Sequence, residues 1–234
     1  MTRRNLALLG AALFLSMTQP SRSWAQSGGF AAGSRDLFVL DLASIPTGEL
    51  PQVCGPRMPP PCIELMRGNV TTVDKDGSHM LRAADPAQLW IRLPQVMPSD
   101  FTIELDLIPK PLGVAPTDFN IEGTREPNRG AASLMLEWQT QAIRVIGGAE
   151  GADFQRPQPE DLKATTSANL TEIRFSYDNG AVKLYVNGQR LVNLPNLAFA
   201  RTRGLRLELG GADDDKEAVY LAKFRLATNS PKPQ

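Results

Sequence analysis

The stretch 170–194 contains two Asn-Gly pairs, Asn179-Gly180 and Asn187-Gly188, and each pair separates two short runs of alternating residues. Asn-Gly in this setting is the strongest short-range hairpin signal, because a type I′ turn needs positive φ at both central residues. In the run before the first pair, the apolar positions are Ile173, Phe175 and Tyr177. Alternation gives a strand one buried face and one face in water. The stretch therefore predicts three antiparallel strands and an all-β chain.

The same alternation recurs from residue 35 to residue 227, most clearly in 101–108 and 204–209. Many short strands separated by turn residues favour a sandwich over a sheet with crossover helices. The proline- and glycine-rich stretch Pro109–Gly130 is predicted to be a long loop at one end of the sandwich. The predicted strands are Leu37–Leu42, Asn69–Val73, His79–Arg82, Leu89–Leu93, Phe101–Ile108, Ala132–Trp138, Ala142–Ile146, Thr171–Tyr177, Val182–Val186, Gln189–Val192, Gly204–Leu209 and Ala218–Leu226.

The first 25 residues have the pattern of an export signal. Arg3 and Arg4 precede an apolar run over residues 6–17, and small residues flank Trp24 before a predicted cleavage after Ala25. The apolar run is shorter than a membrane span. We therefore expect a periplasmic or secreted protein with no membrane span in the mature chain, exported by the general or the twin-arginine route. Residues 26–34 are expected to be a flexible linker, 35–228 the sandwich, and 229–234 a polar tail.

Charge and cysteine content narrow the classes of partner. The chain has 25 basic and 25 acidic residues, and removing residues 1–25 takes away three arginines and no acid. A slightly acidic mature chain with no basic patch argues against binding nucleic acid. Cys54 and Cys62 are the only cysteines. In an oxidising compartment we expect them to form a disulfide, which would stabilise the fold by roughly 2–3 kcal/mol.

Three segments carry a resemblance to a known family. The strand Pro98–Asp106 (PSDFTIELD), the double hairpin Ile173–Gln189 and the last two strands, 204–226, resemble concanavalin A-like, laminin G-like jelly-roll domains, of the kind found in bacterial OmpA-family envelope proteins. The resemblance implies a jelly-roll sandwich of two antiparallel sheets. It also implies that a ligand meets the concave sheet or the loops at its rim. One such fold hosts many activities, so the resemblance does not choose among them.

Two places could supply the carboxylates of a glycosidase or polysaccharide lyase. Glu104 and Asp106 share one face of their strand, as a paired acid and base would require. Glu137 stands beside an aromatic residue that could stack on a sugar ring. Alternation alone favours plain solvated charges at all three positions. Whether the chain is an enzyme stays open, and we favour a protein without catalysis.

The candidate ligand-binding residues are polar or aromatic positions expected on wet faces. Tyr185 alternates with Leu184 and Val186 and is predicted to be an exposed aromatic. Arg144 and Glu137 fall on the polar sides of their strands, and Asp118 and Arg125 fall in the predicted loop.

A metal site has one weak candidate, the turn with Asp213, Asp214 and Asp215. Carboxylates on a loop suit Ca²⁺, but three consecutive acids do not make a cage, so we expect no cofactor, with calcium as the alternative. The leading hypothesis is an exported, non-catalytic module that binds a glycan or a protein surface in the bacterial envelope. The alternatives are a glycoside hydrolase or polysaccharide lyase of the same fold, and a structural protein that packs against an envelope partner.

Overall fold

The computed structural model describes residues 29–43, 45–108, 117–123, 133–139, 142–147, 152–154, 170–194, 199–210 and 218–230. Both Asn-Gly pairs have positive φ at each central residue: 47° and 98° at Asn179 and Gly180, and 46° and 82° at Asn187 and Gly188. The predicted turn geometry is therefore confirmed, and it fixes the meander of the three strands around it.

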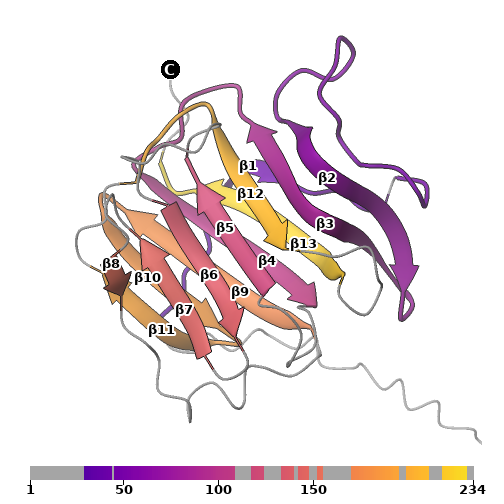
Figure 1. Ribbon diagram of the computed structural model, residues 1–234. Helices are drawn as coiled ribbons and strands as arrows, with labels where there is room; N and C mark the ends of the chain where they lie inside the picture. The colour runs from indigo at the N-terminus through magenta and orange to yellow at the C-terminus, as the bar shows by residue number, and fades with distance from the viewer. Residues whose placement is uncertain are drawn as a thin grey trace, which may run out of the picture.

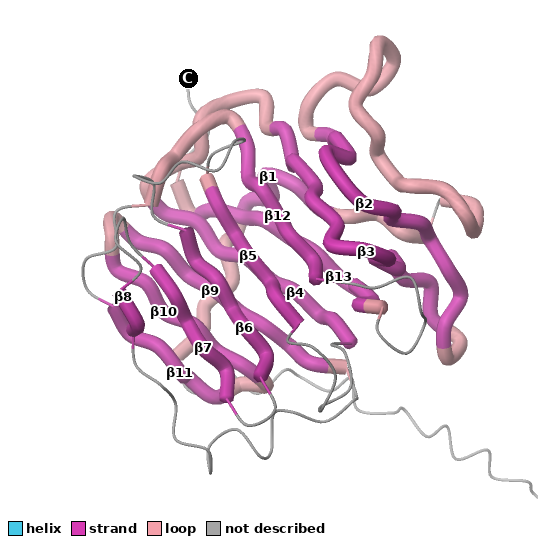
Figure 2. The backbone as a smooth tube through the Cα atoms, viewed as in Figure 1, coloured by secondary structure: helices cyan, strands magenta, loops and turns pink. Residues whose placement is uncertain are grey.

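The described residues form strands and connecting loops, with no helix among them (Figure 2). Every pairing between named strands is antiparallel. The strands are β1 (Arg35–Val39), β2 (Cys62–Lys75), β3 (Ser78–Arg92), β4 (Asp100–Ile108), β5 (Thr117–Glu122), β6 (Ser133–Gln139), β7 (Ala142–Gly147), β8 (Ala152–Phe154), β9 (Thr171–Asp178), β10 (Ala181–Val186), β11 (Gln189–Leu194), β12 (Gly204–Gly210) and β13 (Val219–Thr228).

The strands make two layers, and β12, β5, β6 and β7 lie in front of β13, β4, β9 and β10 in Figure 1. We call the strands β1-β13-β4-β9-β10-β11 the back layer and β3-β12-β5-β6-β7-β8 the front layer, with β2 outside β3. The long strand β3 joins the layers, because its first part pairs with β13 and its second part with β12. The predicted class, an all-β jelly-roll sandwich of antiparallel strands, is confirmed.

The core lies between the two layers and follows the predicted alternation. Phe101, Ile103, Leu105 and Leu107 of β4 are at most 1% exposed. The three leucines of β12 face them across the interior and are equally buried. Full burial of each such side chain stabilises the fold by about 1.5–3 kcal/mol. The alternate positions of these strands are therefore the ones that form the outer faces.

The strand β3 is longer than predicted. The sequence predicted two strands here, His79–Arg82 and Leu89–Leu93, with Pro86 between them. The structure has one strand, and β2 makes two register shifts opposite the proline, around Gly68. Gly68 has a φ of 80°, and a Cβ there would lie 2.8 Å from the Pro86 carbonyl oxygen. A bulge in the neighbouring strand thus lets β3 continue past a proline.

The predicted loop Pro109–Gly130 is wrong in its middle part. Thr117–Glu122 is β5, and it pairs with β12 on one side and β6 on the other. The flanking prolines and glycines hid a short alternation in the sequence TDFNIE. The strand β8 was also missed. The placement of β5 matters for function, since it brings a polar strand into the front layer.

The two ends of the described chain lie against the back layer. Residues 29–34, expected to belong to a linker, cross its outer face, and the Gly33 amide donates to the Thr102 hydroxyl at 2.9 Å. At the other end, Asn229 accepts a hydrogen bond from the Ser34 amide at 3.0 Å. The predicted disulfide between Cys54 and Cys62 is present, with an S–S distance of 2.04 Å.

Candidate functional site

Glu104 and Asp106 lie on the outer face of the back layer, within an ion-pair network. Arg225 donates to one oxygen of Glu104, and Lys223 Nζ lies 2.9 Å from the other. Arg174 donates to Asp106 at 2.6 Å, and its Nε lies 3.9 Å from Glu104. Three cations from two neighbouring strands therefore compensate the two carboxylates.

This network changes what Glu104 can do chemically. Glu104 is only 8% exposed, so the expectation of solvated charges is wrong. Burial raises the pKa of Glu104, but hydrogen bonds and charges from Lys223 and Arg225 outweigh it and leave the pKa below its ordinary value. A general acid needs a raised pKa. The geometry around Glu104 therefore argues against the acid role that a glycosidase would give it.

Tyr185 lies on the outer face of the back layer, as its alternation predicted, but it is not exposed. Its ring is 1% exposed, since Phe30 packs on it edge-on at 5.8 Å between ring centroids. Gly29 lies against its hydroxyl. The prediction of an exposed aromatic is therefore wrong, because residues 29–34 cover it.

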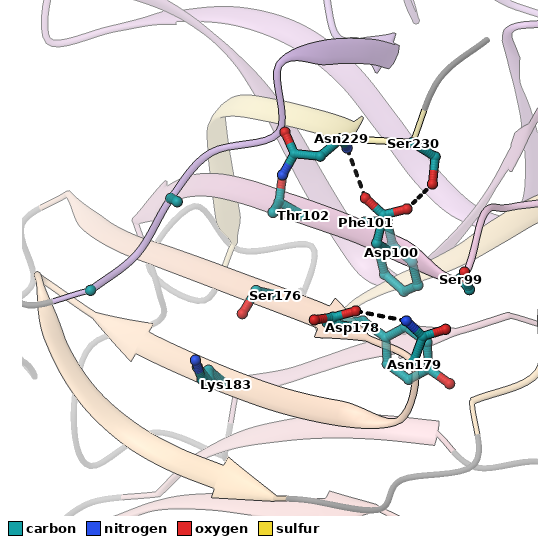
Figure 3. Close-up of a pocket in the computed structure, with 13 residues that line it drawn as sticks. Ser99, Asp100, Phe101, Thr102, Ser176, Asp178, Asn179, Lys183, Asn229 and Ser230 are labelled. Atoms are coloured by element: carbon teal, nitrogen blue, oxygen red, sulfur yellow. Dashed lines mark hydrogen bonds between the residues drawn. The ribbon is translucent and has the colours of Figure 1, made fainter.

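A polar pocket of about 490 Å³ opens beside this segment, at the end of the back layer where β4 begins and β9 ends. In Figure 3, Asp100 is bonded to Asn229 and Ser230, while Ser176 and Lys183 stand apart from these bonds. Ser176 and Lys183 are Cα partners on β9 and β10. The pocket thus combines carboxylates, hydroxyls and one amine.

The front layer brings together three of the predicted ligand-binding residues. Asp118 of β5 pairs with Glu137 of β6, and Glu137 pairs with Arg144 of β7. Cross-strand partners share a face of the sheet. We call Asp118, Glu137 and Arg144 the acidic-basic row. The register thus places Glu137 and Arg144 side by side, whereas Tyr185 lies on the other layer.

The same face carries a second polar row that the sequence reasoning missed. Trp90 of β3 pairs with Arg206 of β12, and Arg206 pairs with Glu122 of β5. Leu205 and Leu207, on either side of Arg206, belong to the core, so Arg206 lies on the outer face. The indole of Trp90 lies over Gly204, where a Cβ would come within 2.2 Å of Cζ2. The alternation of Gly204–Gly210 could have identified Arg206.

The remaining predicted site residues, Arg125, Asp213, Asp214 and Asp215, lie outside the described residues. Among the residues that the structure does describe, no group of three or more His, Cys, Asp or Glu side chains could hold a metal ion. Within the same ranges, no helix is long and apolar enough to cross a membrane.

Comparison with known proteins shows a likeness in fold. The carbohydrate-binding module CBM66 from Bacillus subtilis matches with a TM-score of 0.49 and 9% identity, over 71% of this chain and 95% of that one. Domain 4 of AbnA, a GH43 extracellular arabinanase from Geobacillus stearothermophilus, matches with a TM-score of 0.49 and 19% identity, over 74% of this chain and 84% of that one. The botulinum neurotoxin serotype D binding domain matches with a TM-score of 0.50 and 11% identity, over 74% of this chain and 45% of that one. No family model and no curated protein matches the chain.

Proposed function

We propose that the protein is an exported, non-catalytic module that binds a glycan on the outer face of its front layer. The observation that carries the proposal is the register of β5, β6 and β7, which aligns Asp118, Glu137 and Arg144 in one row. Cross-strand partners on three adjacent strands share one face of the sheet, so two acidic residues and one basic residue lie in line across it.

The chemistry of this face suits a polyhydroxylated ligand. Carboxylates accept hydrogen bonds from sugar hydroxyls, and a guanidinium donates several in a fixed planar geometry. Trp90 and Arg206 continue the same face toward β3, but they are only 7% and 2% exposed, so the ligand surface proposed here is confined to the row on β5, β6 and β7. Polar groups spread across several strands favour an extended chain of sugars over a single enclosed unit.

A second candidate function is glycoside hydrolysis on the same face. The specific observation that favours it is the direct pairing of Asp118 with Glu137 across β5 and β6. A retaining glycosidase needs two carboxyl groups about 5 Å apart, and directly opposed residues on adjacent strands have Cα atoms about 4.5–5.5 Å apart. We favour the binding module, because Glu104 and Asp106, the other predicted catalytic acids, are ion-paired with neighbouring cations.

The test is retention on a glycan array and on insoluble cell-wall polymers by the chain from residue 26 onward. Glu137→Gln and Arg144→Gln are each expected to weaken retention at least tenfold. Arg190→Ala, an exposed cation on the back layer, is the matched control and is expected to have no effect. Unchanged retention by both front-layer variants would refute the proposed surface.

The same preparation separates the two candidate functions and tests for calcium. A hydrolase would release soluble sugars from the polymer that it binds, and Glu137→Gln would abolish release while keeping retention. A binding module would release none. Loss of retention in EDTA, restored by added Ca²⁺, would show that calcium takes part.

The envelope context is part of the proposal and has its own test. Export is supported by the charged, apolar and small-residue pattern of residues 1–25. An association with other envelope proteins is supported by the resemblance of the strands to the jelly-roll domains of OmpA-family envelope proteins. Fractionation of producing cells and N-terminal sequencing of the mature chain are expected to give a periplasmic or secreted protein that begins at Gln26. A full-length cytosolic chain would contradict this part.

A further inference from the structure

We propose that the pocket at the end of the back layer is a second binding site, which takes one neutral sugar ring. This inference deepens the proposed function and rests on it for the class of ligand, but it concerns the opposite layer of the sandwich. The volume of about 490 Å³ lies within the usual range for small-molecule sites, about 300–1,000 Å³. The site is defined by Ser176, Asp178, Lys183 and Asp100 (Figure 3).

Two polar side chains in the pocket, Ser176 and Lys183, make no interaction within the described part of the protein. Ser176 and Lys183 are cross-strand partners on the outer face. Neither side chain has a hydrogen bond or ion pair in the part of the chain that the structure describes. Thr102, the next residue in this row on β4, already accepts a hydrogen bond from the Gly33 amide. The Lys183 amine and the Ser176 hydroxyl are therefore available to hydrogen-bond a ligand.

The carboxylates that line the pocket are oriented by hydrogen bonds from their neighbours. Asp100 accepts hydrogen bonds from the Asn229 amide at 2.9 Å and from the Ser230 hydroxyl. Burial raises the pKa of Asp100, but these hydrogen bonds outweigh it and hold the pKa below its ordinary value. Asp178, its cross-strand partner, accepts from the Asn179 amide group at 2.9 Å. Both carboxylates therefore line the pocket, Asp100 oriented by two hydrogen bonds and the more exposed Asp178 by one.

The combination of two carboxylates, an amine and a hydroxyl in the pocket favours a neutral ligand over a charged one. A phosphate or a carboxylate would gain from Lys183 but would be repelled by Asp100 and Asp178. A metal ion would find only two carboxylates, with the amine of Lys183 beside them. The hydroxyls of a neutral sugar can donate to carboxylates and accept from an amine at the same time. A hexopyranose thus fits the donors and acceptors better than a charged ligand does.

The pocket is completed by both ends of the domain. Gly29 and Ala31 form one wall, and Asn229 and Ser230 form another. The pocket residues on strands belong to β4, β9 and β10, whereas the acidic-basic row belongs to β5, β6 and β7. The two sites therefore lie on different layers and can be removed separately.

The experiment measures binding of a panel of neutral methyl hexopyranosides and N-acetylhexosamines by ligand-observed NMR, with glucuronate and inorganic phosphate as charged probes. At least one neutral sugar is expected to bind at millimolar concentration, and both charged probes more weakly. Ser176→Trp, which would fill the pocket, and Lys183→Met, which removes its amine, are each expected to weaken binding at least tenfold. Arg190→Ala is the matched control. If Ser176→Trp does not fold, as judged by circular dichroism, Lys183→Met decides.

The outcomes distinguish this inference from the proposed function. Front-layer variants that lose the polymer but keep the single sugar support two separate sites. If the front-layer variants lose single-sugar binding and the pocket variants keep it, the second site is overturned and the proposed function is left intact. A wild-type protein that binds no member of the panel, or prefers a charged probe, would also overturn it, whatever the polymer retention.

Discussion

The two ends of the outer face of the back layer differ sharply, although the same strands form both. Around Glu104 and Arg174, which are cross-strand partners, the charges are compensated and nearly buried. Two residues along the same strands, the partners are Thr102 and Ser176, and a pocket opens beside them. Ion pairs close the end around Glu104, whereas the polar side chains at the other end line a pocket that a ligand can enter.

The difference comes from the third strand. On β13, the partner of Glu104 is Arg225, whereas the partner of Thr102 is Ala227. A guanidinium reaches across and closes the first end, and a methyl group cannot do the same at the second. Alternation therefore places a residue on a face, while the identity of its partners on the adjacent strands decides whether it is available to a ligand.

Arg174→Ala is expected to have the largest effect, because it opens the closed end. Arg174 donates to the carbonyl oxygens of Leu105 and Ile173 and to the carboxylate of Asp106, and it is 8% exposed. Removing one partner of a buried ion pair leaves the other charge poorly compensated, so we expect a loss of about 3 kcal/mol in the free energy of unfolding. Urea unfolding measures it. Arg190→Ala is expected to change stability by less than about 0.5 kcal/mol.

The pH dependence of stability probes the same end without removing an arginine. The folded pKa of Glu104 lies below its ordinary value near 4.5. Its contribution is therefore present above that ordinary value and is lost as the pH falls through the folded pKa. We expect urea midpoints of the wild type to fall more steeply below about pH 5 than those of Glu104→Gln. Parallel curves would show that Lys223 and Arg225 do not stabilise the folded carboxylate.

Much of the fold could be predicted, because the relevant signals are local. A turn at Asn179-Gly180 and the alternation in 101–108 are properties of neighbouring residues, and the structure confirms the turn and the core positions of that strand. The continuation of β3 through Pro86 could not be predicted in this way, since it depends on a bulge at Gly68 in another strand. The strand β5 was hidden because its flanking prolines and glycines outweighed a six-residue alternation.

The candidate site was only partly predictable, for a related reason. Alternation placed Glu137 and Arg144 on the polar sides of their own strands, and only the register of β6 and β7 made them partners. The burial of Tyr185 depends on Phe30, which is far away in the sequence. The pocket residues Ser176 and Lys183 carried no distinctive signal, because a serine and a lysine on a wet face are ordinary in any sandwich.

The ion pair between His79 and Asp74 is more exposed than the network around Glu104, so we expect it to have a smaller effect on stability. The His79 Nδ1 donates to Asp74 and its Nε2 to the Ile45 carbonyl at 2.8 Å. Only the imidazolium can donate from both nitrogens, and the hydrogen bonds to Asp74 and Ile45 raise its pKa above the ordinary 6.5. The stability from this contact is present below the ordinary value and is lost as the pH rises through the folded pKa.

Hydrogen exchange near this contact measures the effect. The Gly48 amide donates to the Thr72 carbonyl at 2.7 Å and ties the segment that contains Ile45 to β2. We expect its protection, corrected for the intrinsic rate, to fall as the pH rises past neutrality in the wild type. Protection in His79→Gln is expected to stay level. Equal profiles would show that the imidazolium does not hold the segment.

The open end is expected to show the smallest effect on stability. Lys183 has no hydrogen bond or ion pair with the described residues, so Lys183→Met removes no interaction that the folded chain needs. We expect its free energy of unfolding in urea to differ from the wild type by less than about 0.5 kcal/mol. A loss approaching that of Arg174→Ala would mean that the amine has a structural partner. The contrast between a closed end and an open end would then fail, because both ends would be held by charge.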